Sequence, residues 1–532
     1  MKTRGFGRRH LAAIPFLLLA IAGCGARGKD QTSVIHRRLE GEPATLNVLL
    51  ITSDPDMVVL ALLSRNLLDY DANLELVPGL AESVVPDESH LAYTVTLRQG
   101  VRWEDGSPVT ADDVAYTIRT LMDPKTPALN RRGFFEGFER VDRVDDRTAR
   151  VVFKFPSAGR LDAFNLSLLP AAKYAGTDIN TNPRNRAPLA NGPYRLARWD
   201  AGHSLELVRN TQYFGEKPPA ERVVFRVAPD SSSSFQALLT GDLDETRLDF
   251  EQKKRLDAQA GVPARSLVNE SLGYSYIGWN NRNPLFSEAR VRRALTLLLD
   301  RETIAKTLYG GLARPSNGPV PPGLWSHDPS IAAWPYDPKR AEADLDAAGF
   351  KRGADGVRAR AGKRFSFRLS FGSGSDLQRQ VAELTQQSYR KAGIEVILAP
   401  LEWSAFSTQV DAGEFEACAL AMALDPNPDL SLNWHSSQVP PNGFNSVFYV
   451  NPKADALMDR LKTTFDREDA KKLYAELARL IHEDEPVTFL HTVTIKWGVN
   501  RRIEDVSNSV YGLFLFWPGA ASWRPVRVKA PI

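Results

Sequence analysis

The sequence predicts an α/β protein, because segments with the apolar spacing of helices alternate with segments that read as strands. Residues 377–392 carry one apolar stripe at helical spacing, and residues 394–398 directly after them alternate between apolar and polar. Residues 93–97 alternate in the same way, and a helical stripe follows within residues 110–121. Repeated pairs of strand and helix are typical of lobes in which helices pack on a sheet. A length of 532 residues allows about three such units of roughly 150 residues.

The composition is that of an ordinary globular protein, with 25% charged and 43% hydrophobic residues. The formal net charge is +3, and residues 1–23 contain four basic residues and no acid. Removal of that segment would leave a formal net charge of 3 minus 4, or −1. We therefore expect no basic surface for nucleic acid. The chain has two cysteines, Cys24 and Cys418, so a disulfide framework is not predicted.

The N-terminus reads as an export signal. A basic start is followed by an apolar run over residues 11–22, which is too short to cross a bilayer comfortably. Residues 21–24 resemble a bacterial lipobox, so we expect a lipoprotein signal peptide over 1–23, lipidation of Cys24 and a polar tether over 24–35. The alternative is an ordinary signal peptide with an incidental cysteine. Lipidation predicts a periplasmic protein anchored to a membrane of the cell envelope.

Several elements have clear start and stop signals. In the first half we expect a helix over 58–70, and a second helix that Thr110 caps together with Asp113 and that ends before Asp123. In the second half a strand is expected over 274–280. Helices are expected within 284–304, after Asp337, and over 466–482.

The sequence contains none of the common motifs of catalysis or metal binding. The sequence has no Gly-x-Ser-x-Gly elbow, no His-Glu-x-x-His pair and no phosphate-binding loop, and its eight histidines are scattered. We therefore predict no enzyme, no metal site and no cofactor. A secreted hydrolase of peptides or sugars that uses paired carboxylates stays open as the alternative.

One stretch resembles a known family. Residues 97–114, LRQGVRWEDGSPVTADDV, are similar to the signature of the family 5 extracellular solute-binding proteins, the peptide-binding and nickel-binding components of ABC importers. Residues 41–47 and 78–83 are also similar to family strings, with Asn47 in place of the usual acid.

The resemblance implies a two-lobed periplasmic-binding-protein type II fold with an extra α/β subdomain inserted in the first lobe. The expected division is a first-lobe core over 36–73, 188–275 and 497–532, an inserted subdomain over 74–187, and a second lobe over 276–496. The crossings near 275 and 497 would act as hinges.

The resemblance also implies a function. A monomer would capture a peptide between two closing lobes, with the peptide treated as an added strand, and would deliver it to ABC permease and ATPase subunits. A similar small polar ligand, or a metal chelate, haem, opine or oligosaccharide, stays open because the family also contains binders of these ligands.

The ligand-binding residues follow from positions that match the family. Relatives place an aspartate for the peptide's amino group ten residues after the aromatic of a Gly-x-aromatic-acid string, and the string at residues 413–416 leads to Asp425. A second register places Met422 there, and Asp425-Pro426 also reads as a simple turn. Relatives that bind short peptides carry arginines that bind the carboxylate end of the peptide. In this sequence, a count without gaps along the same match places Val410 and Ala419 at two such positions.

Further candidates come from both lobes. Glu402-Trp403 matches a Glu-Trp pair whose tryptophan lies near the ligand in relatives. The alternative is that the Trp403 indole packs in the core. The complete predicted set is Asp425, Trp403, Thr52, Ser53, Asp54, Tyr276 and Asn280.

Overall fold

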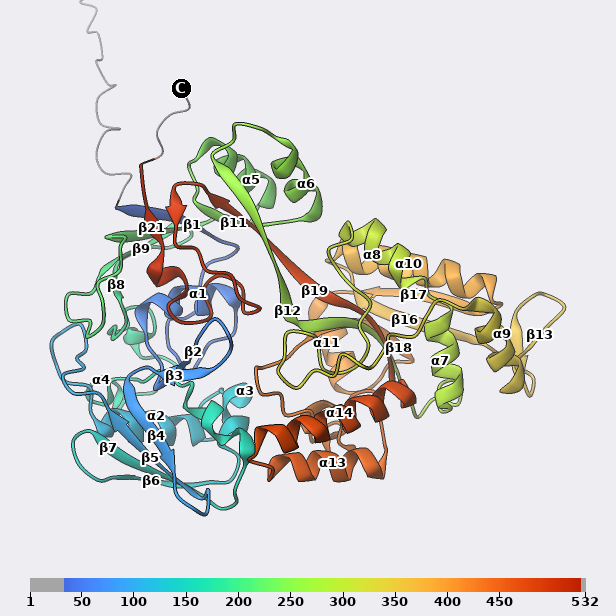
Figure 1. Ribbon diagram of the computed structural model, residues 1–532, viewed down its shortest axis with the longest axis horizontal. Helices are drawn as coiled ribbons and strands as arrows, with labels where there is room; N and C mark the ends of the chain where they lie inside the picture. The colour runs from blue at the N-terminus through green and yellow to red at the C-terminus, as the bar shows by residue number, and fades with distance from the viewer. Residues whose placement is uncertain (1–32, 528–532) are drawn as a thin grey trace, which may run out of the picture.

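The computed structural model describes residues 33–527 and shows two lobes joined by two long strands (Figure 1). The predicted signal peptide and the lipidation site Cys24 lie outside the described residues. The joining strands are β12 (Ala264–Trp279) and β19 (Val487–Asn500), which pair antiparallel along most of their length. Within the described part of the chain, no helix combines the length and the apolar character that a membrane crossing needs.

A ten-stranded sheet runs through both lobes in the order β17-β16-β18-β12-β19-β11-β1-β10-β9-β8. Its first-lobe strands are β1 (Val34–Leu39), β8 (Tyr194–Asp200), β9 (Ser204–Arg209), β10 (Arg222–Val227) and β11 (Glu245–Leu248). Its second-lobe strands are β16 (Ser366–Gly372), β17 (Glu395–Leu401) and β18 (Ala417–Ala423). The sheet is mixed, because β1 pairs parallel with β10 whereas β12 pairs antiparallel with both of its neighbours.

The two lobes have separate hydrophobic cores. The core of the first lobe gathers buried residues between 35 and 225 and between 497 and 523. The second lobe has two large clusters, which together draw on residues between 272 and 490. A β-bulge lies in β12 between Glu270 and Tyr274, where the strand passes from one core to the other. The lobes are therefore two packed bodies connected by strands.

A smaller antiparallel sheet is attached to the first lobe, in the strand order β4-β5-β7-β6. Its strands are β4 (Ala81–Pro86), β5 (Ala92–Leu97), β6 (Phe138–Arg143) and β7 (Thr148–Phe153). Helix α2 (Ala111–Met122) packs on it, and its capping box of Thr110 and Asp113 confirms the predicted helix start. The short helices α3 (Leu129–Arg132) and α4 (Ala171–Tyr174) and the 3₁₀ turn Ala158–Phe164 also belong to this subdomain.

The remaining helices cover the sheets, as an α/β class predicts. Those of the first lobe are α1 (Asp54–Leu63), α5 (Ser231–Thr240) and α6 (Phe250–Ala258). The second lobe carries α7 (Ala289–Leu297), α8 (Arg301–Tyr309), α9 (Pro338–Ala347), α10 (Asp376–Lys391), α11 (Trp403–Asp411), α13 (Pro452–Lys462) and α14 (Arg467–Asp484). Asp337 caps α9 and Asp466 caps α14, in agreement with the predicted helix starts.

The expected helix over 58–70 was wrong at its C-terminal end. Helix α1 ends at Leu63, and Leu68–Tyr70 forms strand β2, which pairs with β3 (Leu76–Pro78). The Asp69 carboxylate accepts hydrogen bonds from the Asn66 backbone and side-chain amides, at 3.3 and 3.1 Å. Such a local side-chain acceptor offers the backbone an alternative to the helix.

Candidate functional site

A cavity of about 410 Å³ lies where the first lobe, the inserted subdomain and the second lobe meet. Apolar side chains from α1, from residues before it and from the C-terminal segment form much of its lining, among them Ile51, Met57, Phe514 and Phe516. Among the described residues that line it, Asp425 is the one contributed by residues 276–496. Its size is within the range of small-ligand sites.

Five polar side chains from distant segments gather at this cavity, and we call them the Asp425 cluster: Tyr70, Arg131, Asp162, Asp425 and Tyr511. They come from the first lobe, the inserted subdomain and the loop after β18, and all five line the same cavity. The rings of Tyr70 and Tyr511 meet edge to face, with 5.8 Å between their centroids.

Asp425 follows the end of β18 by two residues and is reached by solvent within the cavity. Among the described residues it has neither a hydrogen-bond partner nor an ion-pair partner. Burial raises the pKa of its carboxyl group, and the positive charge of Arg131 opposes part of that shift. An acid that lines a cavity, has a raised pKa and is left without a partner is a characteristic of binding and catalytic sites.

Asp162 lines the same cavity as Asp425 but has two hydrogen-bond donors, both of which bind its Oδ1. The Tyr70 hydroxyl donates a short hydrogen bond to it, and the Asn427 side-chain amide donates to its Oδ1 at 2.8 Å. Burial raises the pKa of Asp162, and the nearby charge of Asp425 raises it further, while these hydrogen bonds lower it. The Asn427 Oδ1 accepts a hydrogen bond from Trp325 Nε1 at 2.7 Å. Asp162 is thus part of a chain of contacts between the inserted subdomain and the second lobe.

A second contact between the lobes is the ion pair of Arg467 and Glu75, at 2.8 Å. It lies at a neighbouring cavity of about 350 Å³ between the inserted subdomain and helices α13 and α14. Asp162 lines both cavities, so it marks the boundary between them.

Strand β18 has one edge that is largely unpaired. It pairs with β12 along its full length, from Ala417 to Ala423. On its other side it pairs with β16 only at Ala417 and Cys418, and no other described strand continues the ladder toward Ala423. Strands β12 and β18 approach each other closely at Gly273. A Cβ atom at this position would lie 2.4 Å from the Met422 carbonyl oxygen, so the approach needs glycine. An extended chain could add to the free edge.

The comparisons with known proteins assign a family to this chain. The family profile described as bacterial extracellular solute-binding proteins, family 5 Middle, matches residues 75–443. The chain belongs to this family. The oligopeptide-binding protein AppA of Bacillus subtilis is 31% identical over 467 residues, which are 85% of this chain and 84% of AppA. Di/tripeptide-binding protein 2 of Pseudomonas aeruginosa is 28% identical and covers 77% of this chain and 80% of its own length.

Solved structures of similar proteins have the same two-lobed fold. AppA of Bacillus subtilis in complex with a nonapeptide superposes with a TM-score of 0.78 at 28% identity, over 93% of this chain and 99% of AppA. NikZ of Campylobacter jejuni in complex with Ni(L-His) gives a TM-score of 0.78 at 25% identity, with the same coverage. The α/β class and the family resemblance found in the sequence are thereby confirmed. This family consists of solute-binding proteins.

In this family 5 protein, the predicted first-lobe residues beside α1 are engaged within the lobe. The backbone amides of Thr52 and Ser53 donate to the buried Asp56 carboxylate, at 3.0 and 3.1 Å, and Ser53 caps α1. Asp54 forms an ion pair of 2.9 Å with Arg247. None of Thr52, Ser53 and Asp54 lines the 410 Å³ cavity.

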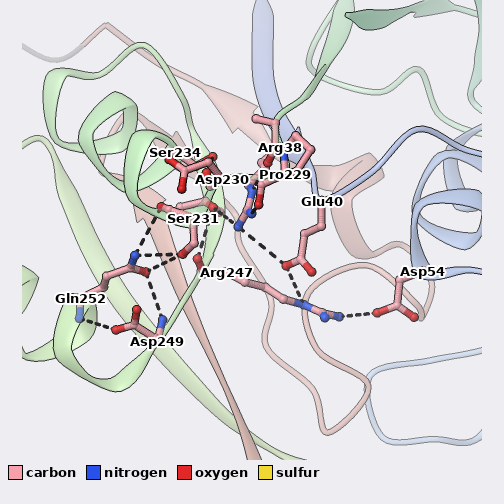
Figure 2. A network of polar contacts seen from close by, with 12 residues as sticks. Arg38, Glu40, Asp54, Pro229, Asp230, Ser231, Ser234, Arg247, Asp249 and Gln252 are labelled. Atoms are coloured by element: carbon pink, nitrogen blue, oxygen red, sulfur yellow. Dashed lines mark hydrogen bonds and ion pairs between the residues drawn. The ribbon is translucent and has the colours of Figure 1, made fainter. Parts of the chain in front are cut away.

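Asp54 belongs to a group of charges that we call the α1 network, consisting of Arg38, Glu40, Asp54 and Arg247 (Figure 2). Arg247 joins Asp54 to Glu40, and Glu40 also faces Arg38. The Arg38 guanidinium donates to the carbonyl oxygens of Ala228 and Pro229, just before helix α5. Every charge of this network therefore has a partner inside the first lobe.

The other predicted residues lie in the second lobe, away from the cavity. Trp403 is 59% exposed at the start of α11, where its ring contacts Phe406. Tyr276 is 6% exposed and packs in the core. The Asn280 amide donates to the carbonyl oxygens of Gly413 and Phe415.

The alternative anchor position, Met422, is half-buried, and its sulfur accepts a hydrogen bond from the Tyr274 hydroxyl at 3.2 Å. Of the predicted set, the structure brings Asp425 to the cavity, and it adds Tyr70, Arg131, Asp162 and Tyr511, which sequence reasoning missed. No local pattern marks these four, because they are far apart in the sequence. Within the described chain, no group of histidine, cysteine and acidic side chains is arranged to hold a metal ion.

Proposed function

We propose that this protein is the substrate-binding component of an ABC importer and captures peptides with a free amino terminus between its two lobes. The observation that carries the proposal is the unpartnered Asp425 carboxylate at the cavity between the lobes. A peptide's ammonium group would supply the missing ion pair and hydrogen bonds. AppA of Bacillus subtilis, which resembles this chain over most of its length, is an oligopeptide-binding protein.

The free edge of β18 supports a peptide rather than a compact ligand. An extended peptide that pairs antiparallel with residues 419–423 would bring its amino end toward Asp425, two residues beyond the strand. Backbone pairing does not depend on side chains, so we propose that the protein accepts varied sequences, with water filling the space that smaller side chains leave.

The proposed working cycle is closure of the lobes about β12 and β19. We propose a first-lobe core over 36–73, 188–275 and 497–532, an inserted subdomain over 74–187 and a second lobe over 276–496. A ligand favours the closed state only by the difference in its affinity for the two states. Asp425 would bind the ligand more tightly in the closed state than in the open state, because the other described residues that line its cavity belong to the first lobe and the inserted subdomain.

We further propose that the protein works as a monomer in the periplasm, anchored through a lipid on Cys24 and coupled to two permease and two ATPase subunits. It binds its ligand without altering it, so no catalytic residue, metal or cofactor is proposed. Replacement of Cys24 by alanine is expected to release the protein from the membrane fraction, as measured by fractionation of cells.

The test of the anchor uses isothermal titration calorimetry with tripeptides that are matched in sequence and carry a free or an N-acetylated amino end. Asp425→Asn is expected to weaken free-amino peptides by about 10- to 100-fold, the size of a lost hydrogen-bonded ion pair, and to leave acetylated peptides unchanged. Asp411→Asn is the matched control, since Asp411 is exposed at the end of α11 and lines neither cavity. Equal losses for both peptide forms would refute the anchor.

A separate experiment distinguishes the binder from a hydrolase. The purified protein is incubated with a peptide pool and examined by native mass spectrometry. Retention of intact peptides is expected. Cleavage products that are absent from a heat-inactivated sample would contradict the proposal and favour a secreted hydrolase.

A further inference from the structure

Two turns, one between β2 and β3 and one between β4 and β5, each place a bulky residue in the left-handed backbone region. Leu74 in the first turn has a φ of +66°, and His90 in the second has a φ of +54°. Glycine and asparagine adopt this region readily, whereas a leucine there is uncommon and strained. Backbone strain of this kind clusters at sites with a function, so both positions call for an explanation.

Both turns are braced in the same way. The Asp71 carboxylate accepts hydrogen bonds from two backbone amides of its turn, at 2.8 and 3.0 Å. The Asp87 carboxylate likewise accepts from two backbone amides that follow it, at 3.1 and 3.3 Å. The backbone amides of Leu74 and His90 donate to the carbonyl oxygens of Asp71 and Asp87, at 3.1 and 3.0 Å. These bonds hold the two left-handed residues in fixed positions.

The two side chains meet the second lobe at the same place. Leu74 packs against a second-lobe core and lines the 350 Å³ cavity together with Phe465. The His90 ring is stacked on the Phe465 ring, with 3.8 Å between the centroids and 18° between the planes. The ion pair of Glu75 and Arg467 lies at this cavity as well. Neither Leu74 nor His90 lines the 410 Å³ cavity that contains Asp425.

We propose that Leu74 and His90 form a latch that favours closure of the lobes without touching the ligand. This inference rests on the lobe closure of the proposed function and adds two positioning residues to it. The latch is built from side chains of the protein alone, so it contributes to the closed state equally for every ligand. The apparent dissociation constant is inversely proportional to the fraction of protein that is competent to bind, so the latch raises all affinities by one common factor.

The latch is packed loosely enough to release. A cavity of about 350 Å³ remains between Leu74 and second-lobe side chains such as Trp325 and Met458. The Phe465 side chain is 42% exposed. Apolar side chains beside a gap lose part of their dispersion contacts, so this contact is weaker than the packing inside either core. It therefore shifts the balance between open and closed states without locking the lobes.

The first measurement follows the lobes in the absence of ligand. Spin labels are attached at Asp146→Cys in the inserted subdomain and Asp376→Cys in the second lobe, positions whose side chains are 84% and 90% exposed. The background is Cys24→Ala, in which the remaining cysteine, Cys418, is buried. Double electron–electron resonance gives the distribution of distances between the labels. Leu74→Asn keeps a residue that suits the left-handed turn and removes the apolar side chain, so it is expected to lower the ratio of closed to open protein about 3- to 10-fold.

The second measurement compares ligands by calorimetry. Leu74→Asn is expected to weaken the free-amino and the N-acetylated peptides by the same factor, about 3- to 10-fold. Asp425→Asn is expected to act mainly on the free-amino form, so the two variants have different signatures. Leu74→Met restores an apolar side chain and is expected to recover most of the affinity and of the closed fraction.

Two further variants complete the test. Val144→Ala is the matched control, because Val144 is 61% exposed near another turn of the inserted subdomain and lines neither cavity. It should change neither readout. His90→Asn removes the ring stack, keeps a residue suited to its turn, and is expected to shift both readouts in the same direction as Leu74→Asn. Thermal denaturation checks that each variant folds, and His90→Asn carries the test if Leu74→Asn does not fold.

The latch is refuted if the variants leave the distance distribution of the ligand-free protein unchanged. It is also refuted if Leu74→Asn weakens the free-amino and acetylated peptides by different factors, because Leu74 would then act on the amino end of the ligand. The distance measurement needs no ligand, so its result is independent of the amino anchor. A failure of the anchor would appear in Asp425→Asn while the distances still responded to Leu74→Asn.

Discussion

The α1 network and the Asp425 cluster are both groups of charges, and they differ in how completely the protein pairs them. In the α1 network every charge meets an opposite charge or a carbonyl oxygen of the first lobe (Figure 2). In the Asp425 cluster, Asp425 has neither a hydrogen-bond partner nor an ion-pair partner among the described residues, and Arg131 has no acidic partner there and donates only to the Asn165 carbonyl oxygen. Charges completed within the chain hold a lobe together, whereas charges left incomplete at a cavity are suited to a ligand.

The strongest test of this comparison concerns an ion pair deep in the first lobe. Arg37 and Glu245 join β1 to β11 at 3.0 Å, with 1% and 3% of their side chains exposed. Glu245→Ala leaves the Arg37 charge buried without its acid, and we expect a loss of about 3 to 5 kcal/mol in the free energy of unfolding. Denaturant titration measures this loss.

The matched control is Glu206→Ala, which removes the exposed pair of Glu206 and Arg222 and is expected to cost less than about 1 kcal/mol. Ligand affinity under native conditions is expected to be the same in both variants. If Glu245→Ala and Glu206→Ala had the same free energy of unfolding, the buried ion pair would not be what stabilises the first lobe.

A second test uses a buried acid of the second lobe. Glu485 is fully buried, accepts a hydrogen bond from Thr296 at 2.8 Å, and has its pKa raised by burial from 4.5 to about 7. The folded state thus holds this proton more tightly than the unfolded state does. Stability is expected to fall as pH rises from about 4.5 through about 7, by roughly 3 kcal/mol in total.

Glu485→Gln is expected to remove this decrease and to be the more stable protein at pH 8, as measured by denaturant titration at pH 5 and pH 8. Glu483→Gln, a neighbouring exposed position, should keep the wild-type profile. Parallel profiles of wild type and Glu485→Gln would contradict the raised pKa.

A third test concerns the pH dependence of ligand binding. An ammonium group needs the ionised form of Asp425, whose pKa is raised by burial above the ordinary value of 3.8. Affinity for free-amino peptides should therefore fall by about tenfold per pH unit below that raised pKa, and the fall should begin above the pH at which an ordinary aspartate protonates. Calorimetry across acidic pH measures it, and Asp425→Asn should give a flatter profile.

The smallest effect is expected for the α1 network itself. Asp54→Asn removes an exposed ion pair to Arg247, so we expect a change of about 0.2 to 1 kcal/mol in stability and less than about a twofold change in peptide affinity. A large loss of affinity would bring Asp54 back into the ligand site, as the sequence suggested, and would weaken the comparison.

The sequence was informative where local chemistry decides the structure. The capping box of Thr110 and Asp113 gave the start of α2, and Asp466 gave the start of α14. It was misleading at Leu68–Tyr70, where apolar spacing continued past the end of α1 but the chain turned to form β2. The local acceptor Asp69, together with backbone hydrogen bonds that join Leu67 to Leu166 and Trp517 to Tyr70 in distant segments, outweighed the apolar pattern there.

The site was predicted only in part for the same reason. Counting from a motif reached Asp425, because that residue follows its strand directly. Arg131 and Asp162 lie 294 and 263 residues before Asp425, and Tyr511 lies 86 residues after it, yet all three line the same cavity. The neighbours that leave Asp425 unpartnered are therefore a property of the tertiary fold.

The contacts that join the two lobes beyond β12 and β19 have a kinetic consequence. The ion pair of Glu75 and Arg467 is exposed, and the bond from Asn427 to Asp162 is only partly buried, so each contributes little to holding the halves together. The ring stack of His90 on Phe465, and the packing of Leu74, Val510 and Tyr511 against a second-lobe core, therefore contribute more to holding the lobes together than these polar contacts do. A transporter that opens the lobes to release the ligand must break this apolar packing as well as the contacts of the ligand.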